Sequence, residues 1–253
     1  MKAWQFTGTN NPLTLNEVAE PSAGPGQVVV SVKAAGVCHS DVTAIDDAGW
    51  MPLFPELPRT MGHENAGVIT EVGAGMEHWK VGDRVGLSPV MKDGDALGYG
   101  KWDGGFGPQL LATDDNLVKL PDEVSFELGA MATDAGLTAY HAIMAVGGAK
   151  PGMKVGVIGL GGLGYIGARV AALSGAEVYG AEVTPRRKSS PVRSASPEWP
   201  SPLRRSRTRT WTSSWTTPGS APPPPLRSRP SPSSARWSRW AWDASKRPST
   251  PTR

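Results

Sequence analysis

The stretch KVGVIGLGGLG, residues 154–164, decides the fold of the second half of this chain. Its first five residues predict a short buried strand, and the GxGxxG turn after them precedes a helical run over residues 165–173. Residues 177–181 predict a second strand, with Glu182 at its end. Strand, glycine turn, helix, strand and acid, in this order and at this spacing, are typical of a dinucleotide-binding α/β unit.

The glycines of this turn each have a physical role in binding a dinucleotide. Gly159 permits the tight turn, Gly161 lets the backbone approach a pyrophosphate, and Gly164 lets the helix pack against the strand. With Gly162, they bring the pyrophosphate to the helix N-terminus, where free N–H groups and the helix dipole favour an anion. A glycine-rich turn without a ligand is the alternative interpretation.

The acid at the end of the second strand indicates which cofactor is bound. Glu182 favours NAD over NADP, because a carboxylate binds a ribose 2′-hydroxyl and repels a 2′-phosphate. Arg186 and Arg187 follow closely, so NADP stays open.

A split set of candidate metal ligands lies in the first half of the chain. GVCHSD, residues 36–41, contains Cys38, the only cysteine, and GHENAG, residues 62–67, contains His63, one of four histidines. A thiol and an imidazole, each near a carboxylate, suit a catalytic zinc with few protein ligands and one open position. The alternative is a buried structural cysteine and a histidine satisfied within the core.

From Met1 to about Lys188, the chain resembles the zinc-dependent medium-chain dehydrogenases, which include the alcohol dehydrogenases. Besides the two glycine-containing motifs above, the matching segments are GPGQV (24–28), VGDRV (81–85), GGF (104–106), LVKLP (117–121) and TDAGLTAYH (133–141). The last of these is closest to bacterial members with an aspartate at this point, some of which act on secondary alcohols.

The resemblance assigns the metal ligands and the residue that supports them. Cys38 and His63 match two zinc ligands, and Asp134 takes the position where relatives often have a second cysteine. A carboxylate is an acceptable zinc ligand, so the site keeps three ligands and an open position. Asp41 matches a carboxylate that orients His63 through its other ring nitrogen.

Other positions gain catalytic or cofactor roles from the same resemblance. Glu64 matches a residue that can approach the metal, Ser40 matches the hydroxyl that carries the substrate proton outward, and Thr138 matches a contact near the nicotinamide ring. Thr43 stands where the family's proton relay often ends in a histidine. The implied reaction is hydride transfer between NAD and a primary or secondary alcohol, or the corresponding aldehyde or ketone, with zinc acting as a Lewis acid.

Cysteine usage limits the metal content and the compartment. The chain lacks the four-cysteine lobe that binds a structural zinc in many relatives, so we expect one zinc per chain. A single cysteine excludes an internal disulfide and fits a reducing, cytoplasmic setting. No apolar run reaches membrane-spanning length, and the first residues predict a strand and not a signal peptide, so no membrane contact is expected.

The predicted fold class is α/β, in three segments. Residues 1–148 should form a β-rich, GroES-like catalytic domain, with strands over residues 27–32 and 68–72. Residues 149–188 should begin a doubly wound Rossmann domain, truncated after its first βαβ unit. The intact family member is expected to be a homo-oligomer acting on a small alcohol or carbonyl compound. A zinc-free quinone or enone reductase of the same fold, and a non-functional truncated fragment, are the alternatives.

Residues 189–253 form a third segment of different composition. Residues 1–188 contain 14 Lys and Arg against 21 Asp and Glu, whereas this tail contains 12 against 2, so the net charge of +3 comes from the tail. Proline, serine and arginine at this density, with few aliphatic residues, predict a disordered tail that cannot form a packed core.

The favoured interpretation of the tail is a shift of the reading frame after the Lys188 codon. Codons exist that give residues 189–199 and, in the other frame, ELARSLGVTGV, which resembles a helix end and the next strand. The alternatives are a basic nucleic-acid arm with Trp237, Trp240 and Trp242 as stacking residues, and a proline-rich ligand segment at residues 222–225. With the frame-shift favoured, no nucleic-acid partner is expected.

Overall fold

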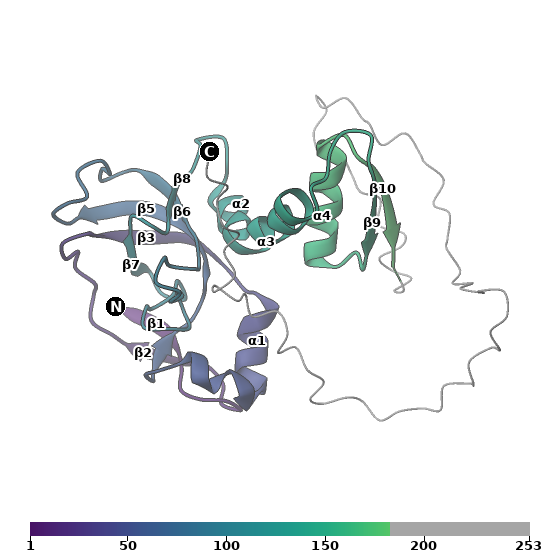
Figure 1. Ribbon diagram of the computed structural model, residues 1–253. Helices are drawn as coiled ribbons and strands as arrows, with labels where there is room; N and C mark the ends of the chain where they lie inside the picture. Colours follow the sequence, from purple (N-terminus) through teal and green to yellow (C-terminus); the bar gives the residue numbers. More distant parts are fainter. Residues whose placement is uncertain (183–253) are drawn as a thin grey trace, which may run out of the picture. The chain divides into compact units, whose positions relative to one another are not determined.

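The computed structural model describes residues 1–182 of the chain (Figure 1). The end of the predicted 149–188 segment and the whole 189–253 tail lie outside the described residues, so the reading-frame hypothesis and the predicted disorder stay predictions. Within residues 1–182, no helix is both long enough and apolar enough to cross a bilayer.

A five-stranded antiparallel sheet, with the strand order β7-β3-β5-β6-β8, forms the centre of the first domain. The strands are β3 (Gln27–Gly36), β5 (Glu64–Val72), β6 (Arg84–Leu87), β7 (Gln109–Thr113) and β8 (Leu117–Lys119). The pairing of β3 with β5 shifts register between Val29 and Val30 and again between Val32 and Ala34. Such bulges bend a strand and increase its twist, which curls the sheet around its apolar side chains.

The two strands predicted over residues 27–32 and 68–72 are confirmed, but both are longer than predicted. β3 continues to Gly36 and β5 already begins at Glu64, so these two residues lie opposite each other in the ladder. Small residues such as Ala and Gly have low strand propensity, and here the cross-strand pairing overrides that preference. The extension brings the chain just after β3 next to the chain just before β5.

Two apolar clusters stabilise this domain. The larger one lies within the curled sheet and consists of Val28, Val30, Ile69, Met76, Val85, Leu87, Leu97, Leu110, Ala112 and Leu117. The smaller one, Phe6, Ala44, Phe54, Met61 and Tyr99, lies by a second sheet with the order β2-β1-β4. That sheet is formed by β1 (Lys2–Phe6), β2 (Thr14–Glu17) and β4 (Arg59–Thr60), and its first strand confirms the one predicted for the N-terminus.

Two helical stretches flank the sheets. Helix α1 (His39–Asp46) begins directly after β3 and leads into the 3₁₀ helix η1 (Ala48–Leu53). Its first turn is held by Asp41, whose carboxylate accepts the backbone N–H of Cys38 at 2.9 Å. That bond satisfies one of the N–H groups that every helix N-terminus leaves unpaired.

A long helical run follows β8 and carries one of the candidate ligands. It consists of α2 (Phe126–Met131), η2 (Ala132–Gly136), α3 (Leu137–Tyr140) and η3 (His141–Val146), and Ser125 caps its start. The segments η2 and η3 are π-helical. π-Helical turns are rare in proteins, and those that occur are often found at functional sites. Asp134 lies in η2, the first of the two.

The last described elements form the predicted strand–turn–helix–strand unit. β9 (Lys154–Ile158) and β10 (Glu177–Ala181) pair in parallel, and α4 (Gly162–Leu173) connects them. Both strands agree with the predicted ranges. The helix begins at Gly162 and not at residue 165, because the glycines of the turn already form its first turn.

Candidate active site

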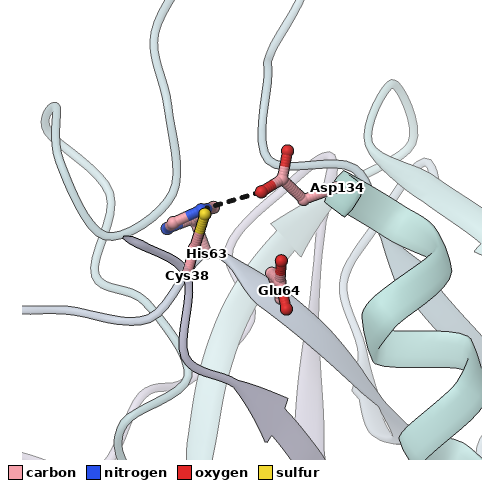
Figure 2. Close-up of side chains that lie close together, drawn as sticks. All are labelled: Cys38, His63, Glu64 and Asp134. Carbon is pink, nitrogen blue, oxygen red and sulfur yellow. Dashed lines mark hydrogen bonds and ion pairs between the residues drawn. The ribbon is translucent and has the colours of Figure 1, made fainter. Parts of the chain in front are cut away.

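Four side chains that can bind a metal converge where β3 ends and β5 begins (Figure 2). Cys38 follows β3, His63 precedes β5, Glu64 is the first residue of β5, and Asp134 reaches the group from η2. One ligand atom from each, a sulfur, a ring nitrogen or a carboxylate oxygen, lies within 4.8 Å of all the others. The structure therefore brings together all three predicted metal ligands and Glu64.

Two glycines make room for this group. Gly36 lies opposite Glu64, and a Cβ on Gly36 would stand 2.0 Å from Glu64 Oε2. Gly62 has φ +96°, which L side chains rarely adopt, and a Cβ there would stand 2.4 Å from the ring of Phe106. The two glycines therefore allow Glu64 and His63 to lie where they do.

The orientation of His63 is set by the carboxylate of Asp41. His63 Nδ1 lies 3.1 Å from Asp41 Oδ1, and both side chains are almost fully buried. The other ring nitrogen, Nε2, lies 3.1 Å from Asp134 Oδ2 and 3.5 Å from Ser40 Oγ. A histidine held in this way at Nδ1 presents Nε2 to a metal, and the carboxylate fixes both its tautomer and its ring orientation.

The charges of the group favour a cation between its members. Burial opposes protonation of His63, but hydrogen bonds with Asp134, Asp41 and Cys38 outweigh it and raise the pKa of His63 to about 11. The hydrogen bond with His63 lowers the pKa of Asp134. Burial and the neighbouring negative charge of Asp134 raise the pKa of Glu64 to about 7. A proton on His63 thus supplies the positive charge that the acids around it require.

This donor set fits a divalent metal such as zinc. One thiol, one imidazole and one carboxylate are ligands that zinc accepts, and three of them leave a position open for a substrate. His63 Nε2 and Asp134 Oδ2 lie 3.1 Å apart, so a metal bound by these two atoms would take the place of a proton shared between them.

Tyr99 belongs to this site although no sequence pattern indicated it. Its hydroxyl lies 2.9 Å from Asp41 Oδ1 and 3.1 Å from Ser40 Oγ. Burial, followed by the Asp41 charge, raises the pKa of Tyr99 above its usual range, so it remains a phenol that can donate. The only sequence signal was an aromatic residue flanked by Gly98 and Gly100, which by itself is typical of an ordinary loop.

Two polar residues that the resemblance singled out have different hydrogen-bond partners. Thr138 Oγ1 donates to Asp134 Oδ1 at 3.3 Å, so this hydroxyl helps to hold the candidate ligand. Its predicted contact with a nicotinamide ring stays a prediction. Thr43 is bonded to the backbone carbonyl of His39 at 3.0 Å within α1, which is an ordinary helical contact.

The predicted cofactor residues meet at the turn between β9 and α4. Gly159 has φ +84°, and a Cβ on Gly164 would stand 1.8 Å from the carbonyl oxygen of Gly159. Both observations agree with the predicted tight turn and close helix packing. Gly161 and Gly162 stand at the start of α4, and Glu182 Oε2 accepts the backbone N–H of Leu160 at 2.9 Å. The glycine turn and the acid are therefore neighbours in space.

Several known proteins have sequences similar to that of this chain. Residues 24–122 match the alcohol dehydrogenase GroES-like domain. An alcohol dehydrogenase of Geobacillus stearothermophilus is 38% identical in an alignment of length 200, and the match covers 72% of this chain and 58% of that protein. NADP-dependent alcohol dehydrogenase C 1 of Mycolicibacterium smegmatis is 31% identical in an alignment of length 203, and the match covers 70% of this chain and 57% of that protein.

A solved structure matches the described fold as well. The alcohol dehydrogenase of the archaeon Aeropyrum pernix has a TM-score of 0.65 and 33% identity, and the match covers 74% of this chain and 60% of that one. These matches confirm the predicted GroES-like domain followed by the start of a nucleotide-binding domain. The chain spans less than two thirds of the length of each of these three proteins.

Proposed function

Because the chain belongs to the zinc-type medium-chain alcohol dehydrogenase family, we propose that it is an oxidoreductase that transfers hydride between an alcohol and a nicotinamide cofactor. The substrate class is a primary or secondary alcohol, or the corresponding aldehyde or ketone. The observation that carries the proposal is the convergence of Cys38, His63 and Asp134 from three separate segments onto one point.

The proposed metal is a single zinc ion, held by Cys38 Sγ, His63 Nε2 and Asp134. Zinc bound there would act as a Lewis acid on the substrate oxygen and lower the pKa of an alcohol. Asp41 keeps Nε2 of His63 directed at the ion through the bond to Nδ1. Glu64 is the fourth group in reach and supplies a carboxylate that can approach the ion from β5.

Ser40 is the proposed acceptor of the substrate proton. Its hydroxyl lies 3.5 Å from His63 Nε2, the atom that faces the metal position, so an alcohol bound at the open position would lie close to it. The hydroxyl also lies 3.1 Å from the hydroxyl of Tyr99, which gives Ser40 a hydrogen-bond partner beside the metal position. Thr43 is bonded within α1 and takes no part in this proposed relay.

NAD is the proposed cofactor, bound at the turn of Gly159, Gly161, Gly162 and Gly164. NAD would accept the hydride from the alcohol carbon. Glu182 lies at that turn and favours a ribose 2′-hydroxyl. The similar Mycolicibacterium smegmatis protein is NADP-dependent by name, so both cofactors belong in the assay. We further propose a reducing, cytoplasmic setting, which keeps the thiol of Cys38 available to a metal, and a homo-oligomeric state for the intact enzyme.

Metal content and turnover, measured separately on the full chain, test this proposal. We expect about one zinc per chain and reduction of NAD in the presence of an alcohol. Loss of both in Cys38→Ser would support a metal-dependent reaction, whereas turnover that persists without zinc would favour a zinc-free quinone or enone reductase. Zinc binding without any turnover would favour an inactive, truncated chain.

A further inference from the structure

Tyr99 reaches the candidate metal centre from a loop that lies outside both ligand motifs. The loop runs from Met91 to Trp102 and contributes no metal ligand. The Tyr99 side chain is 8% exposed, and its hydroxyl lies 2.9 Å from Asp41 Oδ1 and 3.1 Å from Ser40 Oγ. The phenol hydroxyl of Tyr99 therefore contacts both Asp41 and Ser40, two residues of the proposed active site.

The loop is held in one conformation by bonds within it. The carboxylate of Asp95 accepts the backbone N–H groups of Ala96 at 2.8 Å and of Lys101 at 3.1 Å. The N–H of Gly98 is bonded to the carbonyl of Trp102 at 2.9 Å, and that of Gly100 to the carbonyl of Ala96 at 3.1 Å. These bonds close the loop on both sides of Tyr99.

Glycine on each side of Tyr99 lets the loop lie close to the metal-binding segment. Gly98 has φ +77°, and a Cβ on it would stand 3.0 Å from the backbone nitrogen of Gly62, the residue before His63. A Cβ on Gly100 would stand 1.5 Å from Asp95 Oδ1. Larger residues at either position would push the loop, and Tyr99 with it, away from the site.

The ring of Tyr99 is fixed by aromatic neighbours. Its centroid lies 5.6 Å from that of Phe54, 6.1 Å from that of Trp50 and 5.0 Å from that of His63, all in tilted arrangements. Aromatic pairs prefer such separations and inclined geometries. With the ring held in place, the direction of the hydroxyl is set before any substrate binds.

The hydroxyl completes the surroundings of the Asp41 carboxylate. Asp41 Oδ1 is bonded to both His63 Nδ1 and Tyr99, and Oδ2 accepts the N–H of Cys38. One buried carboxylate therefore joins two candidate metal ligands, and the tyrosine is its third partner. Without the phenol, Oδ1 is restrained by the histidine alone.

The single phenol proton also determines how Ser40 is oriented. A carboxylate can only accept hydrogen bonds, so the proton of Tyr99 points to Asp41. The oxygen of Tyr99 is then free to accept, so we assign the 3.1 Å contact between the two hydroxyl oxygens as a bond in which Ser40 donates to Tyr99. This leaves the lone pairs of Ser40 Oγ free to accept the proton of an alcohol.

We infer that Tyr99 is a positioning residue, which fixes His63 through Asp41 for metal binding and turns the Ser40 hydroxyl into an acceptor for the substrate proton. The inference rests on the proposed function for its effect on turnover. Its effect on the geometry of His63 and Asp41 does not depend on that function.

The test compares Tyr99→Phe with Tyr140→Phe in the full chain. Both changes keep the ring and remove one phenol hydroxyl, but Tyr140 lies on α3 and is 54% exposed, whereas the Tyr99 hydroxyl is bonded to Asp41. We expect Tyr99→Phe to release zinc to a competing chelator about tenfold faster, the lower end of the effect of residues that support metal ligands. We expect kcat to fall with little change in the KM for the cofactor. Tyr140→Phe should leave zinc release and kcat close to the wild type.

A second readout separates this inference from the proposed function. The Nδ1–H signal of His63 in NMR spectra of the nitrogen-15-labelled, metal-free chain reports its bond to Asp41. Tyr99→Phe should shift or broaden that signal even if the wild type binds no zinc, an outcome that would refute the proposed function alone. An unchanged signal with unchanged zinc release, or equal losses in Tyr140→Phe, would overturn the inference. If Tyr99→Phe does not fold, Asp95→Asn, which loosens the loop away from the site, must give the same losses to a smaller degree.

Discussion

Removing Asp134 should mainly affect zinc retention, whereas removing Asp41 should mainly affect stability, because Asp134 is a proposed metal ligand and Asp41 a buried hydrogen-bond acceptor. Asp134 is the proposed third ligand, its side chain is 21% exposed, and it lies among Glu64 and His63. Asp41 is a buried support whose side chain is 3% exposed. We therefore expect Asp134→Ala to abolish metal retention with little effect on stability, and Asp41→Ala to reduce stability first.

The expected sizes follow from the bonds that each change breaks. Asp41→Ala leaves the N–H of Cys38, the hydroxyl of Tyr99 and Nδ1 of His63 without their acceptor. Each buried donor left unpaired costs about 1–3 kcal/mol, so the loss should be about 3–5 kcal/mol once some water enters. Asp134→Ala breaks the bond to His63 and the exposed bond from Thr138 but removes repulsion with Glu64, so the free energy of unfolding should change by about 1 kcal/mol or less.

Zinc retention should show the reverse order. Loss of a ligand should accelerate zinc release by more than about a hundredfold, beyond the roughly 10- to 100-fold effect of a supporting residue. Chelator competition measures release, and denaturant unfolding of the metal-free form measures stability. Equal, mild effects of both changes on zinc release would refute the assignment of Asp134 as a ligand. An unchanged stability of Asp41→Ala would refute the role given to Asp41.

Three further outcomes are expected. Zinc must displace a proton from His63, whose pKa is raised to about 11 by its hydrogen bonds, so the apparent zinc affinity should rise by about tenfold or more per pH unit as the pH is raised towards that value, and a pH-independent affinity measured by titration would contradict this. Gly164→Ala should weaken NAD binding in calorimetry, because its Cβ would stand 1.8 Å from Gly159 O, whereas Gly156→Ala, a β9 position with open space around its Cβ, is the control and should bind NAD as the wild type does. Glu182→Gln should improve the ratio of NADP to NAD binding, and an unchanged ratio would remove Glu182 as the discriminating residue.

An element could be predicted from the sequence when all the residues that define it lie in one continuous stretch. The unit from Lys154 to Glu182 was predictable because strand periodicity, the glycine turn and the helix are all encoded within one stretch. Cys38 and His63 stood out by their scarcity. The pairing of Gly36 with Glu64, which makes them neighbours, depends on cross-strand contacts and could not be predicted from either segment.

The place of Tyr99 at the candidate site could not be predicted from the sequence. Tyr99 lies 58 positions from Asp41 along the chain, and only the packing of its loop against Gly62 brings the hydroxyl to the carboxylate. A tyrosine between two glycines has no periodicity and no motif. Asp134 was reached only through the family resemblance, because a carboxylate in a helix is ordinarily a solvated side chain.

The proposed metal centre requires one metal ion bound by the thiol of Cys38. Titration of the metal-free chain with cobalt(II) tests this requirement most directly. Cobalt takes the place of zinc, and its absorption spectrum contains an intense band only when a thiolate is a ligand. We expect that band to saturate at about one cobalt per chain and to be absent in Cys38→Ser. Saturation at two equivalents, or cobalt binding without the thiolate band in the wild type, would contradict the proposed metal centre.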